Sequence, residues 1–226
     1  MSPSRMWWFV PVIVLAAVPC FAAPEPTPEQ VKAFQELKAK AETGDADAQY
    51  LTGAAYGRGE GVAKDDVEAA KWYRKAAEQN NMRGQSMLGV VYTNAKGVPK
   101  DWPEAMKWFN KAAAQNSAHA QYNLGYMYAT GKAGVKDDVQ SAEWYLKAAL
   151  QNDRNSQRII GSYYATGKGL MKDLVQAYAW TSIAATVNEP AKQQLAKLEP
   201  QLSAEQISEA KKLAADLVAN KIKGKK

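Results

Sequence analysis

The chain has 226 residues, ample for one continuous core, and a formal net charge of +6. Its single histidine, His119, and single cysteine, Cys20, exclude a zinc site built from these two residue types. Residues 41–185 hold 17 basic and 15 acidic side chains, and much of the excess charge lies at the C-terminus. The basic stripe that a nucleic-acid partner needs is therefore missing.

Residues 1–22 are predicted to form a signal peptide. Arg5 precedes a nearly all-apolar run over residues 7–18, and the segment Cys20–Ala22 places small residues at the usual cleavage offsets. The run is too short for a comfortable membrane span, so we expect cleavage after Ala22 and no transmembrane segment in the mature chain. A retained membrane anchor and a lipid-modified Cys20 are the alternatives.

Residues 23–43 are predicted to form a short linker and an N-terminal capping helix. The segment Thr27-Pro28-Glu29-Gln30 has the spacing of a capping box, with proline at the first helical position. An apolar stripe then runs from Val31 through Phe34 to Ala41, and we expect this stripe to cover the first repeat.

Residues 44–187 repeat with a period of 36 residues, which predicts four helix-turn-helix units over 44–79, 80–115, 116–151 and 152–187. The residues that keep the period are Trp72, Trp108, Trp144 and Trp180; Gly53, Gly89, Gly125 and Gly161; Tyr56, Tyr92, Tyr128 and Tyr164; and Asp65, Asp101, Asp137 and Asp173. A constant interval without insertions predicts an all-α fold, an α/α superhelical solenoid with a long concave surface.

Each unit is predicted to contain two helices. In the first unit the spacing of Ala48, Thr52 and Tyr56 predicts a helix over about 45–57, which we call helix A. After a glycine-rich loop, Asp65 is expected to cap a second helix, helix B, as its equivalents do in the other units. The residues expected to end helix B in a left-handed conformation are Gly44, Asn80, Asn116, Asn152 and Asn188.

The recurring residues have expected structural roles. Glycine at position 53 and at its equivalents should let helix A approach a neighbour closely. The four tryptophans of the period should lie in the core, because aromatic residues at helical spacing are usually buried. A ladder of rings that stacks sugars or bases is the alternative.

Residues 188–219 are predicted to form C-terminal capping helices. The first covers Pro190 to Leu198, and Ser203-Ala204-Glu205-Gln206 opens a second that is apolar from Ile207 to Leu217. Residues 220–226 are predicted to be a solvated basic tail.

The unit resembles the Sel1-like repeat, a relative of the tetratricopeptide repeat, in four copies from Ala41 to Asn188. In the first copy the resemblance is carried by Gly44, Ala48, Thr52, Gly53, Tyr56, Gly59, Gly61, Val62, Asp65, Ala69, Trp72, Ala76 and Ala77. Local departures are Thr52, Ala95, Ala133–Gly134 and Thr181. The resemblance implies a right-handed α/α superhelix and a role as an adaptor for protein partners in bacterial envelope and signalling assemblies. Some cysteine-rich members have been linked to β-lactam binding or hydrolysis, which does not carry over because those cysteines are absent.

The sequence offers no set of residues that predicts catalysis. The paired carboxylates Asp65–Asp66 and Asp137–Asp138 lie at helix starts, where capping and the helix dipole explain them. The glycine-rich loop over 57–61 lacks the Lys-Ser/Thr of a P-loop and a preceding strand. We therefore expect a protein that is not an enzyme and that holds no cofactor or metal.

A partner-binding face is predicted on helix A. If positions 48, 52, 53 and 56 face inward, the helical period turns positions 47, 50 and 54 and their equivalents outward. Tyrosine and arginine dominate binding hot spots, which favours recognition over simple solvation at these positions. The residues predicted to contact a partner are Tyr50, Arg83, Ser86, His119, Tyr122, Tyr126, Arg158 and Ser162.

Three functions compete. The leading hypothesis is a scaffold, periplasmic or secreted from a bacterium, that binds a protein or peptide partner of the cell envelope through its concave helix-A surface. One alternative is a cell-wall protein that binds or hydrolyses peptidoglycan or muropeptides through its aromatic residues. The other is a lipid-anchored envelope assembly factor, which depends on Cys20.

Overall fold

The computed structural model describes residues 25–132 and 134–223, so the predicted signal peptide over residues 1–22, with Cys20, lies outside it. The described residues form α-helices joined by short turns, without a strand. The helices in chain order are α1 (Pro28–Glu42), α2 (Ala46–Arg58), α3 (Asp66–Glu78), α4 (Met82–Asn94), α5 (Trp102–Ala114), α6 (Ala118–Thr130), α7 (Asp138–Leu150), α8 (Arg154–Thr166), α9 (Leu174–Ala185), α10 (Glu189–Leu198) and α11 (Ala204–Lys223), with a 3-10 turn at Glu199–Gln201. The predicted all-α fold is confirmed.

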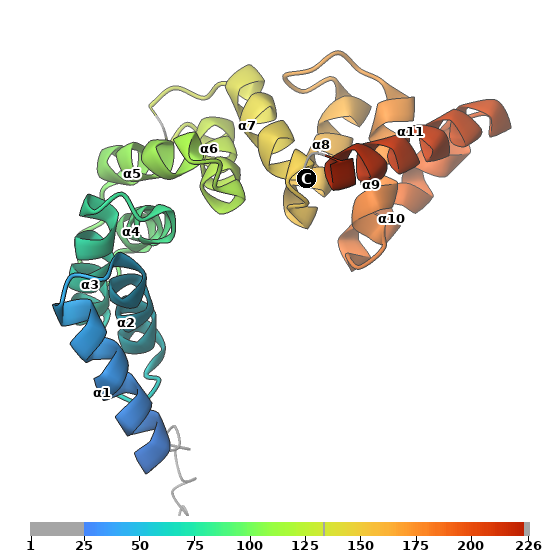
Figure 1. Cartoon of the computed structure of the whole chain (residues 1–226). Helices are drawn as coiled ribbons and strands as arrows, with labels where there is room; N and C mark the ends of the chain where they lie inside the picture. The colour runs from blue at the N-terminus through green and yellow to red at the C-terminus, as the bar shows by residue number, and fades with distance from the viewer. Residues whose placement is uncertain (1–24, 133, 224–226) are drawn as a thin grey trace, which may run out of the picture.

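The helices stack in chain order into a curved array (Figure 1). The pairs α2/α3, α4/α5, α6/α7 and α8/α9 are the helix A and helix B of the four units, and α4, α6 and α8 each also pack against the helix B before them. Helix α4 contacts the A helices on both sides, α2 and α6. The bend opens toward the side on which α2 and α6 lie, so these A helices line its inner surface (Figure 1). In the described part of the chain no helix is long and apolar enough to cross a bilayer.

An aspartate caps each helix B, as predicted. The side chains of Asp65, Asp101, Asp137 and Asp173 accept hydrogen bonds from backbone N–H groups in the first turns of α3, α5, α7 and α9. These N–H groups have no partner inside the helix, and such a cap stabilises a helix by about 1 kcal/mol.

The predicted left-handed helix ends are confirmed with one exception. The φ angle is +99° at Gly44, +63° at Asn80, +69° at Asn116 and +72° at Asn152. The prediction was wrong for Asn188, where φ is −120°. At this point the repeat stops, and the Asn188 side chain instead caps α10 by accepting a hydrogen bond from a backbone N–H at 3.0 Å.

The core prediction holds for three of the four periodic tryptophans. Trp72, Trp108 and Trp180 are 5%, 5% and 2% exposed. Trp144 on α7 is only half-buried, and the Nζ atom of Lys147 lies 4.1 Å from its ring centroid. The Trp144 ring therefore lies at the rim of the core and not inside it.

A close contact between helix A and helix B sets the spacing inside each unit. A β-carbon at Gly53 would lie 2.9 Å from the Tyr73 ring and 3.1 Å from the carbonyl oxygen of Ala69, which is too close for ordinary packing. The contact recurs in the second unit, where a β-carbon at Gly89 would lie 2.6 Å from the Phe109 ring. The role predicted for the periodic glycines is confirmed.

Buried glutamines join each unit to the helix before it. Three of them donate from Nε2 to a carbonyl oxygen in the last turn of that helix, in the pairs Gln49–Ala41, Gln85–Ala77 and Gln157–Ala149. Each of these carbonyls also accepts a backbone hydrogen bond from the turn that follows its helix, so the glutamine adds a second bond. The buried glutamine amide needs this partner, because leaving a buried donor unpaired costs about 1–3 kcal/mol. The glutamines therefore tie each unit to the end of the helix before it.

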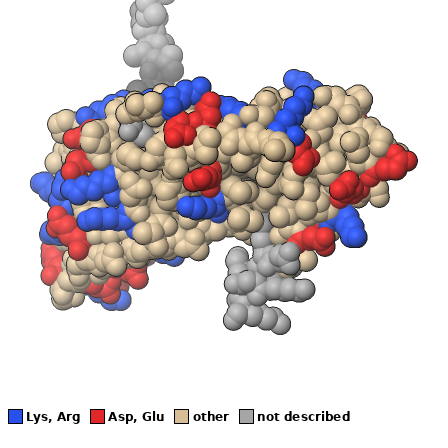
Figure 2. All heavy atoms as spheres, turned by 90° about the horizontal axis from the view of Figure 1, so that it is seen from above, with Lys and Arg blue, Asp and Glu red and all other residues tan. Residues whose placement is uncertain are grey.

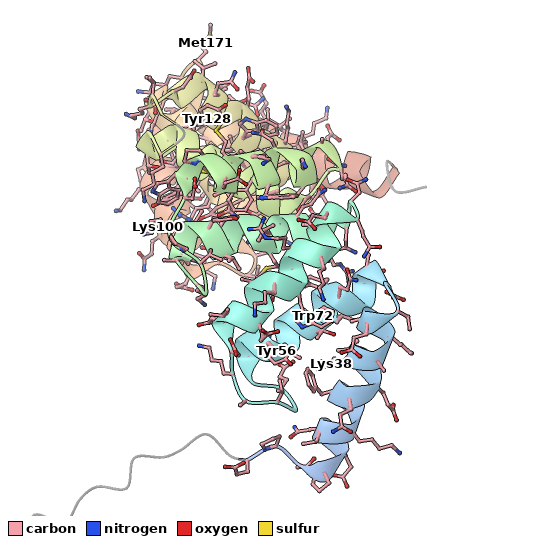
Figure 3. All side chains as sticks on the ribbon, turned by 90° about the vertical axis from the view of Figure 1, so that its left-hand side faces the viewer. Lys38, Tyr56, Trp72, Lys100, Tyr128 and Met171 are labelled. Carbon is pink, nitrogen blue, oxygen red and sulfur yellow. The ribbon has the colours of Figure 1, made fainter. Side chains whose placement is uncertain are left out.

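The predicted N-terminal cap covers the first repeat. Thr27 and Gln30 exchange the two hydrogen bonds of a capping box at the start of α1. Phe34 of this helix packs edge-on against Tyr56, with 5.2 Å between the ring centroids. Figure 3 shows Tyr56 and Trp72 among the first helices of the array, whereas Met171 at the far end points away from the body.

The C-terminal cap is formed by α10 and α11, which both pack against α9. Ser203 and Gln206 form a second capping box at the start of α11. Helix α11 continues to Lys223, past the boundary at residue 219 that was predicted for the caps.

Alanine at Gly53 and alanine at Gly57 should have opposite effects on stability. Both residues lie in α2, where helix propensity favours alanine over glycine by about 1 kcal/mol. Because a β-carbon at Gly53 meets the Tyr73 ring, Gly53→Ala should lower the free energy of unfolding by about 1–3 kcal/mol. At Gly57 the nearest side-chain atom is 3.7 Å away, so Gly57→Ala should be neutral or stabilising by up to about 1 kcal/mol. Urea denaturation measures both, and equal effects would contradict the close contact.

Glycine at Ala95 should stabilise the protein. Ala95 ends α4 with a φ angle of +55°, whereas Gly131 ends α6 in the same left-handed conformation. A β-carbon in this conformation costs about 1–2 kcal/mol, partly offset by the greater freedom of glycine in the unfolded chain. Ala95→Gly should therefore raise the free energy of unfolding by about 0.5–1 kcal/mol, measured by denaturant titration. The reverse change Gly131→Ala is the control and should lower it by a similar amount.

Candidate partner-binding site

The eight residues predicted to contact a partner, which we call the A-helix face, lie on the four A helices. They are Tyr50 on α2; Arg83 and Ser86 on α4; His119, Tyr122 and Tyr126 on α6; and Arg158 and Ser162 on α8. Because α4 contacts both α2 and α6, the first six belong to three adjoining helices. Their surroundings differ, and these differences decide which of them a partner can reach.

Tyr50 and Arg83 meet between α2 and α4. The guanidinium carbon of Arg83 lies 5.9 Å from the centroid of the Tyr50 ring, within the range of a cation–π contact. Tyr50 is half-buried because it also packs against Tyr73 of α3, at 6.0 Å between centroids. Burial raises the pKa of Tyr73 to about 12. Arg83 is exposed and remains available to a partner.

Ser86 does not lie on the open surface, and the prediction that it faces outward was wrong. It is 4% exposed, and its Oγ atom lies 2.8 Å from Nδ1 of His119 on the next A helix. The helical period describes one helix at a time and does not show what the neighbouring A helix covers. Ala54, also expected to face outward, is likewise buried in the core that α2 shares with α4.

His119 is exposed on one side and held against α4 on the other. Burial of the ring lowers the pKa of His119, and the carboxylate of Asp153 opposes this shift. The imidazole is therefore neutral near pH 7, where it shares one hydrogen bond with the Ser86 hydroxyl.

The two tyrosines of α6 differ in burial. Tyr122 is half-buried and packs edge-on against Tyr145 of α7, with 5.6 Å between centroids. Tyr126 is 38% exposed, and its hydroxyl oxygen accepts a hydrogen bond from Lys132 at 2.8 Å. Tyr122 therefore supports the core as well as the surface, and Tyr126 is the more exposed of the two.

Arg158 and Ser162 lie apart from the other residues of the A-helix face. Both are half-buried on α8, and the carbonyl oxygen of Arg158 accepts a hydrogen bond from Gln194 of the C-terminal cap at 3.4 Å. Neither of them lines the hollow between α4 and α6.

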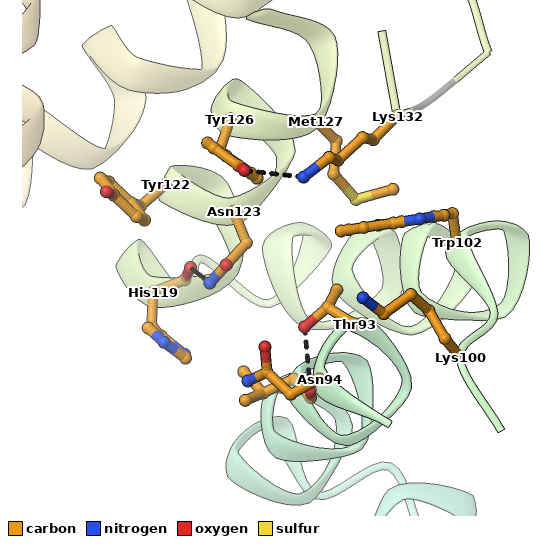
Figure 4. Close-up of a pocket in the computed structure, with 11 residues that line it drawn as sticks. Thr93, Asn94, Lys100, Trp102, His119, Tyr122, Asn123, Tyr126, Met127 and Lys132 are labelled. Atoms are coloured by element: carbon orange, nitrogen blue, oxygen red, sulfur yellow. Dashed lines mark hydrogen bonds between the residues drawn. The ribbon is translucent and has the colours of Figure 1, made fainter. Parts of the chain in front are cut away.

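A hollow of about 460 Å³ opens between α4 and α6 (Figure 4). Three residues of the A-helix face line it, namely His119, Tyr122 and Tyr126. A smaller hollow of about 170 Å³, lined by Tyr50, lies between α2 and α4. The A-helix face is thus indented at two successive contacts between A helices.

Eight further residues line the larger hollow and were not among those predicted to contact a partner. They are Val90, Thr93, Asn94, Lys100, Trp102, Asn123, Met127 and Lys132. Trp102 is the first residue of α5, and the sequence does contain a signal for it, because the equivalent residues of the first and third units are aspartates. A search for breaks in the 36-residue period would have found this position.

Charged residues of both signs are mixed on the outer surface of the bend. Seen from above, lysine and arginine side chains alternate with carboxylates, and large areas carry neither (Figure 2). Among the described residues, no group of three or more His, Cys, Asp or Glu side chains is placed to hold a metal ion.

A model of the Sel1 repeat family matches residues 46–81, 83–117, 118–153 and 155–187, which together make up more than half of the chain. No match is found among curated proteins.

Two solved structures share the architecture. One is a protective antigen present in uropathogenic Escherichia coli strains that displays an SLR fold, with 35% identity and a TM-score of 0.78 over 84% of this chain and 41% of that one. The other is a Sel1 repeat protein from Oxalobacter formigenes, with 30% identity and a TM-score of 0.72 over 83% of this chain and 79% of that one. The chain thus spans less than half the length of the antigen.

Proposed function

The chain belongs to the Sel1 repeat family, and we propose that it is a non-enzymatic scaffold that binds a protein partner through its A-helix face. Sel1 repeat proteins are generally protein-interaction scaffolds. The observation that carries the proposal is the hollow between α4 and α6, which is lined by three residues of the A-helix face together with Trp102. Tryptophan, tyrosine and arginine are enriched in binding hot spots. The hollow presents the first two, and Arg83 and Arg158 lie elsewhere on the A-helix face.

The spacing of these features favours an extended partner segment over a compact ligand. The two hollows lie at successive contacts between A helices, so recognition elements are spread over at least three units. Repeat arrays commonly bind partners along such a surface, because each unit adds a few contacts in the same direction.

We further propose that the scaffold works in a bacterial envelope, as a periplasmic or secreted protein. Support comes from the signal-peptide pattern of residues 1–22 and from the bacterial sources of both similar structures.

Expression of the full sequence in a Gram-negative host should yield a periplasmic protein whose first residue is Ala23. Mass spectrometry of the N-terminus after fractionation measures this. A lipid-modified Cys20 in the membrane fraction would support the lipid-anchored alternative, and an intact N-terminus in the cytoplasm would overturn export.

Removal of two arginines from the A-helix face should weaken partner capture. The variant Arg83→Ala/Arg158→Ala should reduce quantitative crosslinking of the purified protein to its main envelope partner by about thirtyfold or more, because truncation of a hot-spot residue costs about 2 kcal/mol or more. Lys71→Ala/Lys147→Ala is the charge-matched control on the B helices α3 and α7 and should bind normally. Equal capture by both folded variants would place the binding surface elsewhere. Steady turnover of a muropeptide by the pure protein would overturn the non-enzymatic assignment.

A further inference from the structure

Lysines near the start of helix B are paired with an aspartate in the first and third units. In the first unit the Nζ atom of Lys64 lies 3.7 Å from the carboxylate of Asp66, the first residue of α3. In the third unit Lys136 lies 3.3 Å from the carboxylate of Asp138, the first residue of α7. Lys168, from the following unit, lies 3.4 Å from the same carboxylate. The repeat can therefore place one carboxylate between two lysines at this position.

At the second unit both lysine positions are occupied, by Lys100 of that unit and Lys132 of the next, but the carboxylate is missing. Helix α5 begins with Trp102 where α3 and α7 begin with aspartate, while Lys100 and Lys132 are retained at the two lysine positions. Their Nζ atoms lie 5.6 Å and 4.6 Å from the centroid of the Trp102 ring. Neither lysine has an ion-pair partner within the described residues, whereas Lys136 and Lys168 do. Two positive charges at this position are therefore left without a counter-charge.

These lysines face the hollow between α4 and α6. We call its charged part the Trp102 pocket and define it by Asn94, Lys100, Trp102, Tyr126 and Lys132. Figure 4 shows the two lysines on opposite sides of the Trp102 ring, with both ammonium groups directed toward the same space. None of the described residues that line the hollow carries a carboxylate. The pocket thus combines two positive charges with an aromatic wall.

The remaining polar groups of the hollow suit a peptide backbone. The Asn94 side chain makes no hydrogen bond to another described residue, so both its donor and its acceptor are open. Asn123 donates to the carbonyl oxygen of His119 at 2.7 Å, which leaves its side-chain oxygen open. A peptide group needs one donor and one acceptor, and these amides supply both.

We propose that the Trp102 pocket binds an acidic peptide segment of a protein partner, with its carboxylates on Lys100 and Lys132 and a neighbouring apolar side chain against Trp102. The equivalent lysines one unit further on, Lys136 and Lys168, already contact the carboxylate of Asp138, which favours carboxylate over other anions at this position. The inference rests on the proposed scaffold function and specifies the chemistry of the partner at one unit.

A pair of capped peptides tests the proposal on the purified protein. The first is acetyl-Gly-Glu-Leu-Glu-Leu-Gly-amide with a fluorescent label, and the second replaces both glutamates by glutamine. Fluorescence anisotropy should show about five- to thirtyfold tighter binding of the glutamate peptide, the range expected for two partly exposed ion pairs. This preference should shrink at high salt, because salt screens exposed charges.

Three variants assign the preference to the Trp102 pocket. Trp102→Asp introduces the aspartate that the first and third units carry at this position, and it should abolish the preference for glutamate. Val67→Asp adds the same charge at an exposed position of α3 and should leave the preference for glutamate unchanged. Lys100→Gln/Lys132→Gln retains the aromatic wall and should also abolish the preference for glutamate. This variant keeps the test valid if Trp102→Asp lowers stability.

Several outcomes would overturn the inference. These are equal binding of both peptides, a preference that survives loss of both lysines, full competition by millimolar inorganic phosphate, or binding only to a free C-terminal carboxylate. The scaffold function is tested separately by Arg83 and Arg158, which lie outside the Trp102 pocket. If the arginine variant loses partner capture and Trp102→Asp keeps it, the scaffold function is supported. The proposal that the Trp102 pocket binds an acidic segment is then rejected.

Discussion

The contact between a glycine of helix A and an aromatic ring of helix B is the constraint on which the array depends. Without a side chain at the glycine, the ring lies against the helix backbone, and its thickness sets the distance between the two helices. The same contact recurs in the first three units, at Gly53, Gly89 and Gly125. In the last unit Gly161 faces the hydroxyl of Thr181 in place of a ring, and Thr181 accepts a hydrogen bond from Gln194 of α10 at 3.2 Å. The C-terminal cap therefore begins where this contact changes.

Polar groups determine how one unit meets the next. Gln49 donates to the end of α1 and accepts from Gln79, the residue that follows α3, at 2.7 Å, so its buried amide is held from both sides. Gln85 is held in the same way by the end of α3 and by Gln115. A misplaced neighbour would leave several buried groups unpaired at once, whereas an apolar surface alone would tolerate sliding. Ring contacts thus set the distance between helix A and helix B, and the glutamine amides set the alignment of each unit with the next.

Features that depend on one unit could be predicted from the sequence, and features that depend on its neighbours could not. The aspartate caps and left-handed helix ends follow from local spacing and were found in this way. The left-handed conformation predicted for Asn188 was wrong because no further repeat follows it. The outward orientation predicted for Ser86 was wrong because His119 of the next unit covers it. The Trp102 pocket was missed because Lys132 comes from the following unit, so only a structure brings it to Trp102.

The substitution of an aspartate by Trp102 has a consequence for how a partner can lie on the array. Units stacked at a constant interval offer an extended chain alternative frames, each displaced by one unit. If an acidic segment binds Lys100 and Lys132 as proposed, one frame alone pairs its carboxylates with both lysines, because the lysines at the first and third units already contact Asp66 and Asp138. Trp102 then sets the register of the partner along the array, together with the A-helix residues that differ between units.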